Sequence, residues 1–207
     1  MAKHKEGDTG RGRVARQRNV RPIVALATEG LTEKNHSLLL AQRYPVRVRP
    51  RVFDGSHGKK LVDEAATYAE DVKAQHPDAE VVSAAIYDLE NTSNKSWQLA
   101  VETNTYAESK GVLLFVNAPT IERWFVLCLG HKSINASPRV INRELATLIE
   151  QHGLPPYKKP GSPLFHLQLM HYIDDAMERC KQAGHLGELP CMCLFVELVR
   201  SFDGASE

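Results

Sequence analysis

Three short apolar runs divide the first part of the chain into candidate strands. They are residues 23–27, 81–86 and 112–116. Uncharged runs of this length are typical of strands that are covered on both faces. The segments between them have apolar residues at helical spacing, and these segments are 32–43, 60–73 and 96–109. Strands that alternate with helices predict βαβ units, so we expect an α/β fold with a mainly parallel sheet flanked by helices.

The stretch VRVRPRVF, residues 46–53, alternates apolar and basic positions and indicates a strand of a different kind. Its basic side consists of Arg47, Arg49 and Arg51. Pro50 removes one backbone donor, which is typical of an edge strand. The three arginines either protect this edge from pairing with another chain or form a stripe that faces phosphates, and the pattern leaves both interpretations open.

After Pro119 the pattern predicts helices only. The four segments with helical spacing are 120–129, 139–152, 164–183 and 191–202. Loops rich in Pro and Gly separate them, which favours a C-terminal helical layer. We therefore expect a basic arm, an α/β core and a helical part packed on that core, with boundaries at 1–20, 21–135 and 136–207.

Length and composition are those of a soluble globular chain. The 207 residues are 43% hydrophobic and 25% charged, which suits one sizeable core. No apolar run is long enough to cross a bilayer, and the N-terminus lacks the apolar segment of a signal peptide. We therefore expect no membrane association and a cytoplasmic location.

Charge is distributed unevenly along the chain. Residues 1–21 contain seven Lys and Arg against two acidic residues, a net +5, whereas the whole chain carries +1. The remainder is therefore mildly acidic. Basic arms often contact phosphates, although solubility is an equally ordinary reason for them. Arg18 and Arg21 are our candidates for nucleic-acid contacts in this segment.

Four cysteines are present, and their spacing does not indicate a metal site. Cys191 and Cys193 are separated by one residue, which is closer than the usual spacing of a zinc pair. The sequence contains no C-x-x-C pair that the nine histidines could complete. We expect reduced, mostly buried thiols and no structural zinc site.

Carboxylates follow two of the predicted strands. Glu29 comes after the first strand, and Asp88 and Glu90 come after the strand at 81–86. Carboxyl ends of parallel strands converge at one edge of a sheet, where ligands bind in such folds. Either segment alone would suit a helix cap or a turn. Together, at matching strand ends, they favour an oxygen-ligand site for Mg²⁺ or Mn²⁺.

Five motifs, taken in order, resemble a known family. They are IVALATEGLTEKNH, AIYDLEN, VNAPTIERWFVLCLGH, PPYKK and ELPCMCLFVELV. This series is similar to a divergent RloB-like Toprim nuclease over most of residues 21–200. The resemblance implies a metal-dependent phosphodiesterase of bacterial anti-phage defence, with RNA, particularly tRNA, as a plausible target. It also implies that Glu29 acts as general acid or base and that Asp88 and Glu90 hold the metal.

The chain departs from this family at two positions. Glu90 is one methylene longer than the family's aspartate, which changes the geometry around the ion. Where the family has a histidine four residues after the tryptophan, this chain has Cys128, and His131 lies three residues further on. His131 is a candidate for a catalytic or phosphate-binding role, although a histidine near a helix end is more often a surface or capping residue.

Three further residues have both an ordinary and a functional interpretation. Glu122 follows the third apolar strand, so it either favours a helix dipole or points toward the edge that carries the other carboxylates. Lys158 and Lys159 lie in a proline-rich loop, where they are solvated charges or neutralise a transition-state phosphate.

These patterns together predict a divalent-metal-dependent endonuclease that prefers RNA to DNA. The alternative is a non-catalytic nucleic-acid or protein-binding module whose Toprim site has decayed. Expected partners are a nucleic acid and, in addition, a second copy of the chain or a defence-system protein.

Overall fold

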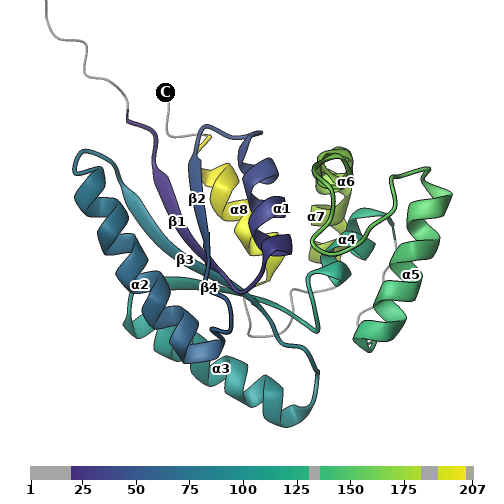
Figure 1. The fold of residues 1–207 in the computed structure, drawn as a ribbon, viewed down its shortest axis with the longest axis horizontal. Helices are drawn as coiled ribbons and strands as arrows, with labels where there is room; N and C mark the ends of the chain where they lie inside the picture. The colour runs from purple at the N-terminus through teal and green to yellow at the C-terminus, as the bar shows by residue number, and fades with distance from the viewer. Residues whose placement is uncertain (1–19, 131–135, 183–190, 204–207) are drawn as a thin grey trace, which may run out of the picture.

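A four-stranded parallel sheet forms the centre of the molecule (Figure 1). The computed structural model describes residues 20–130, 136–182 and 191–203. In the described residues the strand order is β2-β1-β3-β4. The strands are β1 (Ile23–Thr28), β2 (Arg47–Val52), β3 (Val81–Asp88) and β4 (Val112–Asn117). The predicted α/β class with a parallel sheet is therefore confirmed.

Burial explains the position of each strand in the sheet. All six residues of β1 are buried, and β1 pairs with β2 on one side and with β3 on the other. The alternating strand β2 pairs with β1 alone and lies at the edge, as its pattern and Pro50 predicted. Because the register aligns Val24 with Val48, the apolar side of β2 extends the buried face of β1.

Helices cover both faces of the sheet (Figure 1). One face is covered by α2 (Gly58–Gln75) and α3 (Asn94–Ser109), and the other by α1 (Leu31–Ala41) and α8 (Met192–Ser201). The remaining helices are α4 (Glu122–Cys128), α5 (Pro138–Gln151), α6 (Pro163–Leu169), the 3₁₀ turn η1 (Met170–Tyr172) and α7 (Ile173–Gln182). The C-terminal part is helical, as predicted. No helix in the described ranges has the length and apolar character that crossing a bilayer requires.

The C-terminal helices extend the core of one sheet face. Phe115 of β4 packs edge-on against Phe195 of α8, with ring centroids 5.3 Å apart. The same buried cluster includes Leu26 of β1 and Phe165 of α6. The helical part therefore packs on the sheet, and the boundary expected at residue 135 lies outside the described residues.

The long helix expected at 164–183 is interrupted. Ser162 caps α6 by accepting a hydrogen bond from the backbone N–H of Phe165. The tighter 3₁₀ turn then separates α6 from α7, in which Ile173, Met177 and Cys180 are buried. Apolar spacing alone did not reveal this break, because both halves have helical periodicity.

The cysteines differ from the expectation of reduced thiols. Cys180 and Cys193 form a disulfide, whereas Cys128 and Cys191 are buried and not disulfide-bonded. The fold places the end of α7 beside the start of α8, so two residues 13 positions apart in sequence become neighbours. Spacing along the chain did not predict this pair.

A buried histidine makes stability depend on pH. His36 is fully buried and its Nε2 accepts a hydrogen bond from the indole N–H of Trp124 at 2.9 Å. Burial lowers the pKa of His36 well below its ordinary value of 6.5, and the nearby His166 adds to the effect. In the unfolded chain the His36 imidazole takes up a proton near its ordinary pKa, whereas in the folded chain it stays neutral at that pH.

We therefore expect the free energy of unfolding to fall as the pH drops below about 6.5. His36→Gln keeps an acceptor for Trp124 but cannot titrate, so its melting temperature should decline less between about pH 7 and pH 5. Thermal melts over this range measure the difference. His171→Gln, at an exposed position, is the control, and an equal flattening in that variant would contradict the assignment.

Candidate active site

A pocket with a volume of about 640 Å³ opens at the carboxyl edge of the sheet. Its acidic lining residues are Glu29, Glu33, Asp54, Asp88 and Glu90, and Lys159 is the basic one. They come from the last residue of β3, from the segments that follow β1, β2 and β3, and from the loop before α6. The predicted residues Glu29, Asp88 and Glu90 thus lie at one edge of the sheet and line one pocket.

Glu29 is held by two hydrogen bonds. Its Oε2 lies 3.3 Å from Nδ1 of His57 and accepts the backbone N–H of Asp88 at 3.4 Å. The His57 ring also packs edge-on against Tyr87, with centroids 4.7 Å apart. The hydrogen bond to Glu29, together with the charges of Glu29 and Glu90, raises the pKa of His57 against the effect of burial. This pair fixes the direction in which the Glu29 carboxylate points.

Sequence reasoning missed His57, although the signal was available. Asp54 and His57 follow β2 in the same way that Glu29 follows β1. Applying the rule of converging carboxyl ends to the edge strand as well would have brought Asp54 to this pocket and His57 to the neighbourhood of Glu29.

Asp88, the last residue of β3, is anchored through one oxygen. Its Oδ1 accepts hydrogen bonds from Nδ2 of Asn117 at 3.1 Å and from the backbone N–H of Ile121 at 3.0 Å. Burial raises the pKa of Asp88 well above its ordinary value, and the negative charges of Glu33 and Glu122 raise it further. The carboxyl group therefore lies among like charges, in a position where a cation would be stabilising.

Glu90 occupies a different conformation from its neighbours. Its φ of +61° is in the left-handed region, and its backbone N–H donates to the carbonyl of Pro119 at 2.8 Å. The residue is exposed, so its carboxylate lies at the solvent side of the pocket. In the described ranges, the ligand atoms of the acidic residues do not gather in a group of three within 4.8 Å. The carboxylates line the pocket without meeting at a single point.

Glu33, in the first turn of α1, is a further pocket residue that the sequence analysis did not single out. It is only 5% exposed, and burial raises its pKa. A Cβ on Gly30 would lie 2.8 Å from Oε2 of Glu33. Gly30 has φ of −135°, which any residue can adopt, so a larger residue here would require only that the Glu33 carboxylate shift.

Glu122 connects the pocket to the C-terminal loop. It is fully buried, and its Oε1 accepts hydrogen bonds from the hydroxyl of Tyr157 at 2.7 Å and from Nζ of Lys159 at 3.1 Å. Burial alone would raise the pKa of Glu122, but these two partners and Thr120 outweigh burial and lower it. Glu122 is thus a charged group that positions Lys159, while the exposed Lys158 does not line the pocket.

Removing the hydroxyl of Tyr157 tests this connection. Tyr157→Phe leaves the ring in place but deletes a hydrogen bond to a buried carboxylate, so we expect a loss of about 1.5–3 kcal/mol in the free energy of unfolding. Urea denaturation measures the loss. Tyr106→Phe deletes a hydroxyl that bonds to the exposed Asp63 and should cost less. Equal losses of unfolding free energy in the two variants would contradict a specific contribution of the buried Tyr157–Glu122 hydrogen bond.

The arginines of β2 lie on the α2 side of the sheet and outside this pocket. Nη1 of Arg49 donates to Oε1 of Gln75 at 3.4 Å. The guanidinium of Arg51 lies over the rings of Phe53 and Tyr68, at 5.1 and 5.6 Å from their centroids. Arg51 therefore packs on aromatic rings, while Arg47 is exposed.

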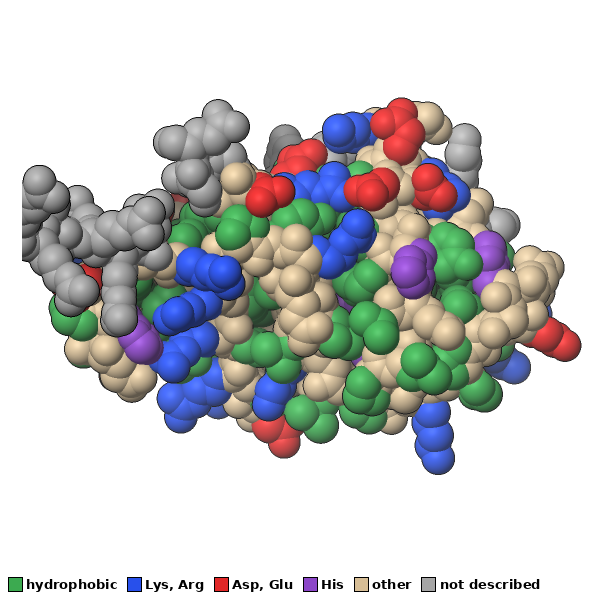
Figure 2. Space-filling view, turned by 90° about the horizontal axis from the view of Figure 1, so that it is seen from above, with side chains coloured by type: hydrophobic (Ala, Val, Ile, Leu, Met, Phe, Trp, Pro, Cys, Tyr) green, Lys and Arg blue, Asp and Glu red, His purple; other side chains and the backbone are tan. Residues whose placement is uncertain are grey.

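The structure describes only some of the other basic residues that were predicted to contact nucleic acid. Arg21 is exposed just before β1, whereas Arg18 and His131 lie outside the described residues. On the face seen in Figure 2, Lys and Arg side chains gather in one run and acidic side chains gather along another edge. Lys and Arg side chains also stand among the acidic ones along that edge.

Comparisons with protein-family models, with curated proteins and with solved structures return no match to this chain, so functional interpretation relies on the sequence motifs and on the geometry of the pocket.

Proposed function

We propose that this protein is a divalent-metal-dependent endonuclease that cleaves RNA, with tRNA as the first substrate to test. One observation carries the proposal: carboxylates that follow separate parallel strands line a single pocket at the carboxyl edge of the sheet. The preference for RNA comes from the resemblance to RloB-like Toprim nucleases.

The acidic pocket suits a hard cation. Asp88, Glu33 and Glu122 bring like charges together in a partly dry environment, and Lys159 supplies one positive charge against them. Carboxylate oxygens are the ligands that Mg²⁺ and Mn²⁺ prefer. Asp88 and Glu90 would hold the ion, which would stabilise negative charge on the scissile phosphate.

The chain's own residues supply the remaining functions. Glu29 takes or donates the proton of the attacking or leaving oxygen, and its bond to His57 keeps it oriented. Lys159, which lines the pocket, would bring its ammonium group beside the phosphate. Arg47, Arg49, Arg51 and the basic arm would bind the nucleic acid outside the pocket.

Incubating the purified chain with bulk tRNA, single-stranded DNA and plasmid tests the proposal. Each substrate is combined with Mg²⁺, Mn²⁺ or a chelator. We expect RNA cleavage that requires the metal and stops with the chelator. Nucleic-acid binding without cleavage under every condition would support the alternative, a binding module with a decayed site. Size-exclusion chromatography of the same sample reports whether the chain forms a homodimer.

The basic arm provides a separate prediction. Deleting residues 1–19 removes most of the +5 charge, so we expect weaker RNA binding and a smaller slope of log affinity against log salt concentration. Fluorescence anisotropy at several salt concentrations measures both quantities. An unchanged slope would mean that the arm makes no phosphate contacts.

A further inference from the structure

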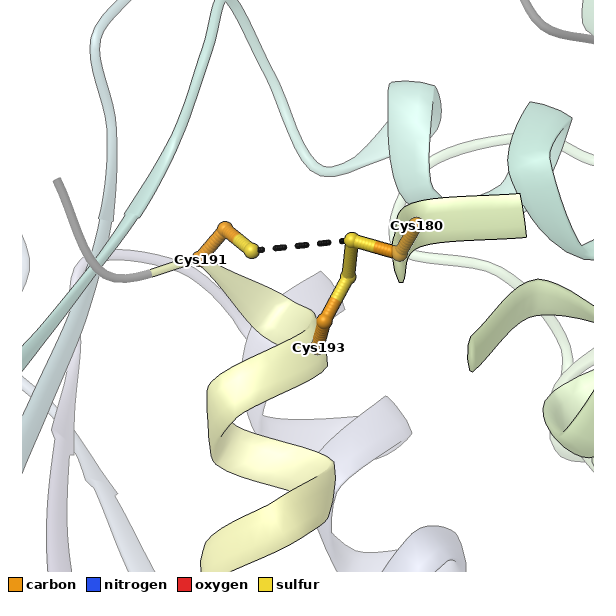
Figure 3. Close-up of side chains that lie close together, drawn as sticks. All are labelled: Cys180, Cys191 and Cys193. Atoms are coloured by element: carbon orange, nitrogen blue, oxygen red, sulfur yellow. Dashed lines mark hydrogen bonds between the residues drawn. A yellow bond between two sulfur atoms is a disulfide. The ribbon is translucent and has the colours of Figure 1, made fainter. Parts of the chain in front are cut away.

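Three cysteine sulfurs gather where α7 and α8 meet (Figure 3), and none of these cysteines lines the acidic pocket. Cys180 lies near the end of α7, while Cys191 and Cys193 lie at the start of α8. Their sulfur atoms are all within 4.8 Å of one another, and Cys191 Sγ is 3.9 Å from Cys180 Sγ. All three residues are at most 6% exposed. The fold thus converts a C-x-C pair and a distant cysteine into one buried cluster.

The cluster borders a small cavity that also contains a buried positive charge. The cavity has a volume of about 30 Å³, enough for one water-sized occupant. Arg123 lines it and is only 7% exposed. Nη1 of Arg123 donates to the carbonyl of Ala118 at 2.8 Å, whereas its Nε has no hydrogen-bond partner among the described residues. A buried guanidinium with unused donor capacity favours negative charge nearby.

We propose that, in the reduced chain, Cys180, Cys191 and Cys193 form a thiolate site for one Zn²⁺ ion. Three protein ligands leave one position of a tetrahedral ion for a water molecule or another donor. Zn–S bonds of about 2.3 Å in a tetrahedron place two sulfurs about 3.8 Å apart. The observed 3.9 Å between the sulfurs of Cys180 and Cys191 fits that spacing.

Charge balance supports the assignment. Three thiolates and Zn²⁺ carry a net charge of −1, and the guanidinium of Arg123 neutralises it inside the same cavity. The ion would therefore bind without leaving an uncompensated charge in the core.

The disulfide form and the zinc form are two states of the same sulfurs. A dithiol reductant donates two electrons and two protons, which opens the Cys180–Cys193 bond to two thiols while the reductant becomes a disulfide. Zn²⁺ then displaces the three thiol protons to solvent. In the reverse direction a disulfide oxidant accepts two electrons from the Cys180 and Cys193 thiolates, takes up two protons from solvent and leaves as two thiols, while the Cys180–Cys193 bond re-forms. This removes two ligands and releases the ion, so the site responds to redox conditions.

The test compares zinc binding by the reduced and the oxidised full-length chain. The disulfide is opened with a phosphine reductant, and Zn²⁺ is titrated against a chromophoric chelator. We expect one equivalent of zinc in the reduced chain and none at the cysteines in the oxidised chain. Co²⁺ in place of Zn²⁺ should produce a thiolate charge-transfer band, which histidine sites elsewhere on the chain do not produce.

Variants locate the site. Cys191→Ser, which leaves the disulfide pair intact, should weaken zinc affinity of the reduced chain by at least about tenfold and diminish the cobalt band. Cys128→Ser, at a buried cysteine outside the cluster, should bind like the wild type. Absence of the cobalt band in the reduced wild type, or unchanged affinity in Cys191→Ser, would overturn the proposal. The wild-type comparison needs no variant to fold, and circular dichroism checks each variant.

Discussion

Replacing Asp88 by Asn is expected to lower the rate of metal-dependent RNA cleavage by about a hundredfold to ten-thousandfold. Several kcal/mol of transition-state stabilisation depend on a bound ion, and each 1.4 kcal/mol corresponds to a tenfold change in rate. The amide oxygen of Asn can still accept the hydrogen bonds that Asn117 and Ile121 donate. Single-turnover cleavage over a range of Mg²⁺ concentrations measures the loss, and high Mg²⁺ should restore part of the rate.

Stability measurements distinguish a functional role of Asp88 from a structural one. The folded protein raises the pKa of Asp88, so ionisation of this group at neutral pH opposes folding. Asp88→Asn should therefore melt at the same temperature as the wild type or higher while losing activity. Asp78→Asn is the matched control, because Asp78 is exposed and precedes the same strand at its opposite end. Wild-type cleavage by Asp88→Asn would place the site elsewhere.

Glu29→Gln separates proton transfer from ion binding at the same pocket. We expect cleavage to fall by a factor typical of general acid–base catalysis, about 10²–10⁴, with metal affinity less affected than in Asp88→Asn. Glu90→Asp shortens this side chain to the length found in the nucleases that the sequence resembles, and it should retain activity. Together with Asp88→Asn, these variants assign a different role to each of the three carboxylates that the strand ends predict.

The second large effect is expected on stability, from a substitution in the hydrophobic core. Phe125→Ala should reduce the free energy of unfolding by about 3–5 kcal/mol, because it empties a fully buried position. The Phe125 ring packs against His36 of α1, Tyr157 and Phe165, with centroids 5.1 to 5.6 Å away. These neighbours come from both the α/β core and the C-terminal helical part. Chemical denaturation with fluorescence and circular dichroism should show one transition for wild type and variant.

Leu164→Ala is the control for this core variant. Leu164 is 54% exposed and adjoins Phe165 in α6, so its truncation should change stability by less than about 0.5 kcal/mol. Two separate transitions in the wild type would mean that the helical part folds independently of the sheet. A small loss in Phe125→Ala would contradict the close packing between the two parts.

Local patterns along the chain were sufficient to predict the architecture. The uncharged runs at 23–27 and 112–116 lie in β1 and β4, and alternation with Pro50 identified the edge strand. These features follow from the period of the backbone and from burial, which act over a few residues. The common edge for Glu29 and Asp88 also followed, because the carboxyl ends of parallel strands share one edge.

Contacts between distant segments were decided only by the tertiary structure. The pairing of Glu29 with His57, the approach of Lys159 to Glu122, and the gathering of three cysteines each join residues from different elements. Periodicity carries no information about such contacts, since they depend on how loops turn and on how helices pack over the sheet. The left-handed backbone conformation of Glu90, in the loop after β3, is an example of a loop turn that periodicity does not predict. Sequence alone therefore determined the strands and the edge where the carboxylates lie, whereas loop turns and helix packing decided which charges and sulfurs came together.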